Sequence, residues 1–172
     1  MSESLGIDLA DWIVNTVYEA IGPAATSDQY TVNVIHRNDV DGPTEWRERR
    51  ETYAPPFGLL RAGPIDQRTT ALVRSKLHQE REYKFTLIFV AMGPAAEAEQ
   101  AARIIADRAY NDALRFMGSG VYGLPAADSG EHATGLEIGQ IRQATFPEFD
   151  GSCYALAYVP LVIQSETGTP PA

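Results

Sequence analysis

The stretch that decides the fold is Tyr83–Met92, YKFTLIFVAM. Side chains alternate along it as they do along a β-strand, and one set is apolar throughout: Tyr83, Phe85, Leu87 and Phe89. The other set also becomes apolar in the second half, at Ile88 and Val90. Since strands with two apolar faces lie inside a sheet, the stretch predicts a central strand over 83–92.

A long helix is predicted directly after this strand, from Pro94 to Met117. Proline fits the first turn of a helix because its missing N–H has no intrahelical acceptor there. The residues at helical spacing are mostly small: Ala98, Ala102, Ile105, Ala109, Ala113 and Phe116. A stripe of this kind lets the helix axis approach a sheet closely.

The remaining elements follow from the same periodicities. An apolar stripe at helical spacing predicts a helix over 4–21, and Gly22-Pro23 ends it. Further strands are predicted over 30–37, 69–79, 135–146 and 152–164. Two helices and segregated strands predict a single α+β domain over 1–164, in which a mostly antiparallel sheet packs against the N-terminal helix and one long central helix. Residues 165–172 are expected to form a flexible C-terminal tail.

The last strand is apolar on both faces, yet it contains Pro160, which cannot donate to a ladder. We therefore expect a bulge or a sheet edge there. If both helices cover one face of the sheet, the other face needs a second layer, and another copy of the chain is the simplest supplier.

Two segments between the first strands are unusual. Residues 45–53, EWRERRETY, are charged at nearly every position and form either a solvated edge or an ion-pair surface between subunits. In 54–64, proline and glycine argue against regular pairing, although Phe57, Leu59 and Leu60 are too apolar for an ordinary surface loop. The loop folds over its own domain or is covered by another chain.

The composition narrows the function classes. The net charge of −9 argues against a protein that grips nucleic-acid phosphates. Cys153 is the sole cysteine, which excludes a disulfide framework. No window has the length of apolar sequence that a membrane span needs. We expect a cytosolic or particle-bound protein with no membrane partner.

The sequence shows no pattern typical of a catalytic or cofactor site. Gly118, Gly120 and Gly123 have dinucleotide-binding spacing but follow a predicted helix, the reverse of the order that this motif requires. The three histidines (His36, His78 and His132) lack the spacing of a zinc site, and NDVDG at 38–42 fits a turn better than a calcium loop. We predict no enzyme activity, no cofactor and no metal.

The order of elements, with YKFTLIFVAMG running into PAAEAEQAARIIADRAYNDAL and the closing segment GQIRQATFPEFDGSCYALAYVPLVIQ, resembles the tail terminator (tail completion) proteins of long-tailed bacteriophages. The closing segment carries most of the resemblance, because an acidic, proline-containing turn leads into the pattern aromatic-x-apolar-x-aromatic at Tyr154–Tyr158. The similarity covers about residues 5–164. The segment 45–64 and the loop 118–134 are longer than a minimal member needs.

The resemblance implies a structural virion protein, made in the host cytoplasm, that forms a homohexameric ring in the neck of the particle. Such a ring stops polymerisation of the tail tube and offers a docking face to the head-closure or connector protein, while DNA passes through its channel without specific binding. Two groups of residues are assigned roles on this basis. Subunit and partner contacts are expected from Trp46, Arg47, Arg50, Phe57, Leu59, Leu60, Tyr154 and Tyr158, and the channel lining from Glu48, Glu51, Asp128 and Glu131.

Three other functions stay open. A head-closure or adaptor protein of the neck is the nearest, and a small α+β enzyme or a ligand-binding module belongs to other classes. A monomer with a deep polar pocket would favour the enzyme, whereas a closed ring with a bore would not.

Overall fold

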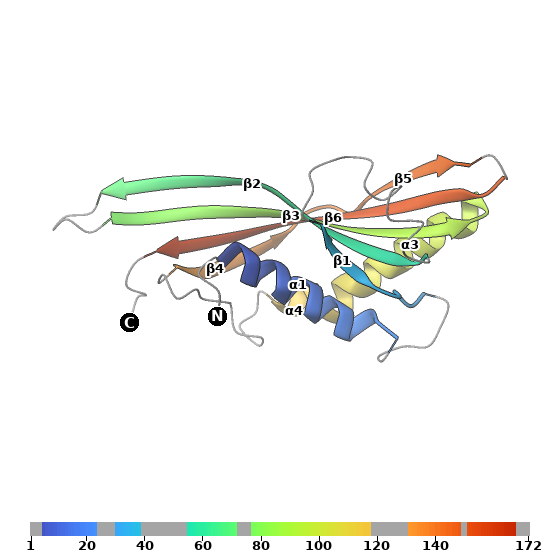
Figure 1. The fold of residues 1–172 in the computed structure, drawn as a ribbon, viewed down its shortest axis with the longest axis horizontal. Coiled ribbons are helices and arrows are strands. Elements are labelled where there is room, and N and C mark those ends of the chain that lie inside the picture. Colours follow the sequence, from blue (N-terminus) through green and yellow to red (C-terminus); the bar gives the residue numbers. More distant parts are fainter. Residues whose placement is uncertain are drawn as a thin grey trace.

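One sheet and two helical stretches make up the part of the fold that the structure describes (Figure 1). The computed structural model describes residues 5–23, 30–38, 55–71, 77–117, 131–148 and 151–167. Its helices are α1 (Leu5–Ile21), α3 (Ala95–Ala109), the π-helical η1 (Tyr110–Leu114) and α4 (Arg115–Met117). Its strands are β1 (Ile35–Asn38), β2 (Phe57–Ala71), β3 (Leu77–Gly93), β4 (Glu131–Ile138), β5 (Arg142–Pro147) and β6 (Cys153–Thr167).

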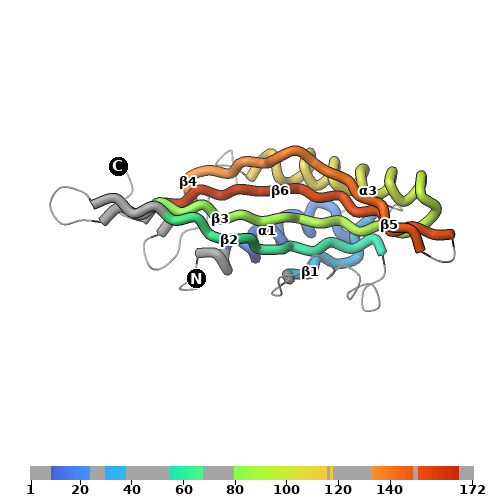
Figure 2. The backbone as a smooth tube through the Cα atoms, turned by 90° about the horizontal axis from the view of Figure 1, so that it is seen from above, coloured from blue at the N-terminus to red at the C-terminus, as the bar shows by residue number. Residues whose placement is uncertain are grey.

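The sheet has the order β1-β2-β3-β6-β4, and β5 also pairs with β6. Every pair is antiparallel except β1 with β2. The strand predicted over 83–92 lies inside the sheet between β2 and β6, as expected (Figure 2). The α+β prediction is confirmed.

Both helical stretches pack on one face of the sheet, which we call the helix face (Figure 1). Five residues predicted to form the inner stripe of the long helix pack on this face from α3 and η1. Each is 1% exposed or less: Ala98, Ala102, Ile105, Ala109 and Ala113. Phe89 of β3 lies in the same core and is fully buried. The π-helical turn places both Ala113 and Leu114 inward. The long helix predicted as one element is therefore an α-helix followed by a π segment in the structure.

The opposite face has a second, smaller core near β1 and β5. Its buried members are Phe57, Leu59, Ile88, Val90, Tyr154 and Leu156. Val34, Phe146 and Tyr158 pack against it. The chain by itself therefore buries these residues, so their apolar character does not require a second copy of the chain to cover them.

Three strand predictions need correction. Irregular structure was predicted for 54–64, but β2 is continuous from Phe57 through Pro64. A shift in the β2–β3 register between Ala62 and Ile65 accommodates Gly63 and Pro64, and a proline is tolerated in such an irregularity because it need not donate to the ladder. Of the strand predicted over 69–79, residues 69–71 end β2 and residues 77–79 begin β3, while 72–76 lie outside the described residues. The strand predicted over 30–37 begins only at Ile35.

The fourth correction concerns Pro160 and the two ends of the last strand. The segment 135–146, predicted as one strand, is two strands, β4 and β5, which pair with β6 on either side of Pro160. At the junction Gly139 N donates to Pro160 O over 2.8 Å. The ladder thus changes partner where Pro160 has no N–H, which agrees with the expected irregularity. Ser165–Thr167, predicted to lie in the tail, belong to β6.

Gly135 and Gly139 both lie beside β6, and Gly139 is expected to tolerate a side chain less well than Gly135. A Cβ at Gly139 would lie 2.6 Å from Cγ of Pro160, inside the sheet. Gly139→Ala is expected to lower the free energy of unfolding by about 1–3 kcal/mol through overpacking.

The matched control is Gly135→Ala, where a Cβ would lie 2.8 Å from Oε1 of Gln164. That atom ends a flexible side chain, so it can move aside, and a change within about 0.5 kcal/mol is expected. Urea denaturation followed by circular dichroism measures both variants. Equal losses would contradict the role given to the Gly139–Pro160 junction.

Candidate functional site: an acidic face of the sheet

The half of the sheet away from β1 and β5 forms the candidate site, and we call it the distal sheet. It contains four strand segments: Ile65–Ala71 of β2, Leu77–Lys84 of β3, 131–137 of β4 and 162–167 of β6. In Figure 1 it extends to the left, where β2 and β6 end and β3 and β4 begin.

Carboxylates gather on the distal sheet's face opposite the helices, which we call the acidic face. Along β3, Glu80 and Glu82 alternate with Arg81 and Tyr83, and Tyr83 belongs to the core on the helix face. The pairing places Asp66 beside Glu82, and Glu166 beside Glu80. Asp66, Glu80 and Glu82 are exposed, and Glu166 is half-exposed.

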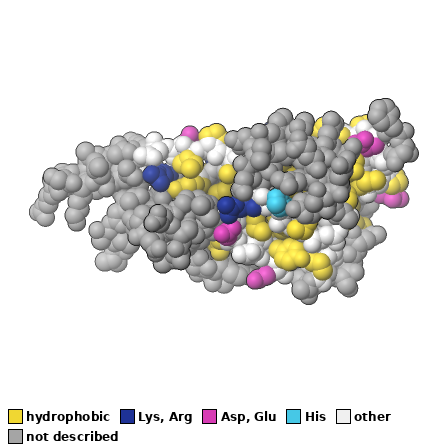
Figure 3. All heavy atoms as spheres, viewed as in Figure 1, with side chains coloured by type: hydrophobic (Ala, Val, Ile, Leu, Met, Phe, Trp, Pro, Cys, Tyr) yellow, Lys and Arg dark blue, Asp and Glu magenta, His cyan; other side chains and the backbone are white. Residues whose placement is uncertain are grey.

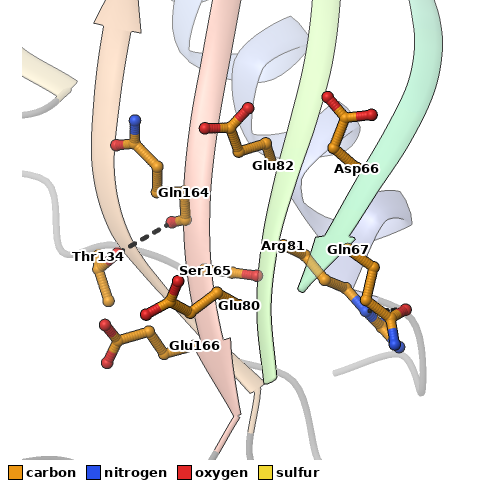
Figure 4. Close-up of a pocket in the computed structure, with 9 residues that line it drawn as sticks. All are labelled: Asp66, Gln67, Glu80, Arg81, Glu82, Thr134, Gln164, Ser165 and Glu166. Carbon is orange, nitrogen blue, oxygen red and sulfur yellow. Dashed lines mark hydrogen bonds between the residues drawn. The ribbon is translucent and has the colours of Figure 1, made fainter. Parts of the chain in front are cut away.

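These residues help to line a hollow of about 480 Å³. The residues that line it come from four strands: Asp66, Gln67, Glu80, Arg81, Glu82, Thr134, Gln164, Ser165 and Glu166. Figure 4 shows Asp66, Glu82 and Gln164 side by side across three strands, with Gln67 and Arg81 lying together away from them. The lining thus contains four carboxylates and one guanidinium, that of Arg81.

Cations compensate part of the acidic face: Lys84 pairs with Asp66, and the register places Arg68 beside Glu80. Lys84 Nζ donates to Oδ2 of Asp66 over 2.6 Å, and this hydrogen bond, followed by the charge of Asp66, raises the pKa of Lys84. Arg81 uses its Nε–H to donate to Oε1 of Gln67 over 3.2 Å, and Nη1 lies 3.4 Å from the Tyr83 hydroxyl. Both Gln67 and Tyr83 lie on the helix face by register, so Arg81 points away from the carboxylates.

Like charges on directly paired residues disfavour a sheet. Glu80 and Glu166 form such a pair, and Asp66 and Glu82 another. Coulomb repulsion across two strands falls steeply with salt because these groups face water. The face is therefore rich in carboxylates, although Lys84 pairs with Asp66 and the register places Arg68 beside Glu80.

The side of the molecule seen in Figure 3 differs from this face. Among its coloured residues, a few basic and acidic side chains lie between apolar and neutral ones. One exposed ion pair of the described chain joins Arg37 Nη1 to Asp11 Oδ1 over 2.8 Å and links β1 to α1.

The residues predicted to contact other subunits are only in part available to do so. Phe57, Leu59, Leu60 and Tyr154 are at most 8% exposed, and Leu60 lies in the core on the helix face. The apolar character that suggested an interface is therefore accounted for within the chain. Tyr158 is half-buried, and burial raises the pKa of its hydroxyl while the charge of Arg61 lowers it.

The predicted channel residues fall largely elsewhere. Six of the predicted interface and channel residues lie outside the described ranges: Trp46, Arg47, Glu48, Arg50, Glu51 and Asp128. The glycines at 118, 120 and 123 also lie outside them. Glu131 begins β4 at the end of the distal sheet, paired through its backbone with Thr167. The acidic face itself was missed, although Glu80, Glu82 and Lys84 alternate visibly in QEREYK.

Two searches of the described part of the chain gave negative results. Three or more histidine, cysteine, aspartate or glutamate side chains do not converge there in a way that could hold a metal ion. Within the same residues, each helix is too short or too polar to cross a membrane.

No protein-family model and no curated protein matches the chain. Among solved structures, one similar chain belongs to a structure described as "Virion of native gene transfer agent (GTA) particle". The likeness covers 87% of this chain and 92% of that one, at 14% sequence identity and a TM-score of 0.44. A likeness of this size assigns no function to the chain.

Proposed function

We propose that the protein is a structural component of a phage-like virion, and that it forms a homohexameric ring at the head-proximal end of the tail tube. In this proposal the ring stops polymerisation of the tube protein and provides the surface on which the head-closure or connector protein docks. DNA passes through the bore. The protein has no catalytic role.

The acidic face is the observation that carries the proposal. It presents Asp66, Glu80, Glu82 and Glu166 on a sheet face opposite the helices that the structure describes. A bore for DNA must not retain the phosphate backbone, and carboxylates repel phosphates through the same long-range field that lets basic clefts attract them. A ring whose bore is lined by the acidic face has this property.

The fold supports the same arrangement. Because both helical stretches cover one face (Figure 1), a subunit can turn its sheet toward a ring axis and its helices outward. Closed rings of identical subunits use two different surfaces of each subunit, head to tail. The order of elements resembles tail terminators, which is the sequence-based support for this particular ring.

The test is assembly on tail tubes. The purified protein is mixed with isolated tail tubes of the virus that encodes it, and tube ends are imaged by negative-stain electron microscopy. The proposal predicts rings at one end of each tube and no further tube growth when soluble tube protein is added. Native mass spectrometry of the ring should then show six copies of the 18.8 kDa chain.

Unbound tubes that keep growing in the presence of the protein would contradict the proposal. Binding at the head-side surface of isolated connectors, without any effect on tube growth, would instead favour a head-closure or adaptor protein.

A further inference from the structure

Among the described strands, the distal sheet has two edges that are paired on one side only and that fit each other. We infer that the edge of β2 at Ile65–Ala71 in one subunit pairs with the edge of β4 at Glu131–Ile138 in the next, joining the distal sheets around the ring. This inference rests on the proposed ring and names the surface that closes it.

The two edges have matching lengths and positions. The pairing of β1 with β2 ends at Asn38 and Arg61. Beyond Arg61, β2 is paired on one side only among the strands that the structure describes. Strand β4 likewise has β6 on one side. In the register of the sheet, Ile65 of β2, Tyr83 of β3, Ile163 of β6 and Leu136 of β4 form one row.

The opposite end of the sheet is less suited to such pairing. Strand β1 has four residues, and short edges are a common protection against unwanted pairing. Strand β5 is held by α3, since Thr145 Oγ1 donates to Oε1 of Glu99 over 2.7 Å and Gln143 Nε2 donates to Glu99 O over 2.9 Å. Pro64 lies before Ile65, so the proposed edge of β2 contains no proline.

Strand direction favours the joint. Within one chain β4 runs antiparallel to β6, and β3 runs antiparallel to both β6 and β2. Strands β4 and β2 therefore run in opposite directions. Rotation about a ring axis keeps the direction of each strand relative to that axis, so β4 meets the β2 of the next subunit as an antiparallel neighbour, which supports a regular ladder.

Side chains on the helix face also fit. Ile65 is 55% exposed, the largest exposed fraction among the large apolar side chains described. In a joint that continues the rows, Ile65 lies beside Leu136, which is half-buried on the same face. Cross-strand apolar pairs of this kind stabilise a sheet. The joint thus covers an isoleucine that the isolated chain leaves in water.

Disulfide trapping tests the joint. Within one chain, Ile65 and Leu136 are separated by three strand spacings, about 14 Å, which no disulfide can span. A chain with Cys153→Ser, Ile65→Cys and Leu136→Cys is therefore expected to link only between subunits. Mild oxidation of the ring should give a ladder of covalent oligomers up to six copies on a non-reducing gel.

The control combines Cys153→Ser with Met92→Cys and Leu136→Cys. Met92 is 48% exposed but lies at the other end of β3. This control should give at least tenfold less ladder. A six-copy ring by native mass spectrometry with equal crosslinking in the two proteins would overturn the joint and leave the ring standing, whereas no ring in solution or on tubes would overturn both.

A second pair of variants tests the apolar contact. Ile65→Asp is expected to shift the protein from rings to monomers with at least a tenfold loss of ring, while Met92→Asp keeps the ring. Both side chains are exposed in the single chain, so far-ultraviolet circular dichroism should match the parent protein. An Ile65→Asp protein that forms rings as readily as Met92→Asp would contradict the inference.

Discussion

Replacing Phe89 with alanine is expected to lower the free energy of unfolding by about 3–5 kcal/mol. Phe89 is fully buried on the central strand, in the core between the sheet and the helices. Truncation removes the transfer free energy of the ring and leaves a cavity that strands on both sides of β3 keep open. Thermal and urea denaturation followed by circular dichroism measure the loss.

Met92→Ala is the control for this prediction because Met92 lies on the same strand and is 48% exposed. Its loss is expected to be within about 1 kcal/mol, since the side chain is half in water already. Similar losses at Phe89 and Met92 would show that the interior of β3 is not the centre of the core.

The second large effect is expected from charge reversal on the acidic face. Glu82→Lys with Glu166→Lys should convert a ring that ignores duplex DNA into one that binds it at 50 mM salt. Because such binding releases counterions, the affinity should fall by about 1,000-fold or more between 50 and 200 mM salt. Fluorescence anisotropy of a labelled duplex measures both.

The matched control is Glu97→Lys with Asp107→Lys, which changes the net charge equally at exposed positions on α3. In the proposed ring α3 faces outward, so this variant is expected to bind the duplex at least tenfold more weakly than the acidic-face variant. Equal affinities would mean that only net charge matters and that the acidic face has no special place in the assembly.

The periodicity of the sequence correctly predicted the elements that pack against the rest of the same chain. The alternation of Tyr83–Met92 and the alanine stripe of α3 each require burial on defined faces, and the structure confirms both. Prediction failed at Pro64, where an irregularity of β2 accommodates proline inside a strand. It also failed at 135–146, where the predicted single strand divides into β4 and β5 opposite Pro160.

The candidate site was harder to predict because it depends on register. Glu80 and Glu82 are neighbours in sequence, but Asp66 and Glu166 join them only through the pairing of β2, β3 and β6. The sequence also suggested that Phe57, Leu59 and Tyr154 need a partner chain, because apolar character alone does not tell a core from an interface. Their burial within the chain answers that question.

Electron cryomicroscopy of the protein bound to tail-tube ends tests the central claim most directly. The account predicts a closed sixfold ring with Asp66, Glu82 and Glu166 facing the bore and α3 on the outside. A protein that stays monomeric both alone and with tubes, or a ring whose bore is lined by α3, would contradict it.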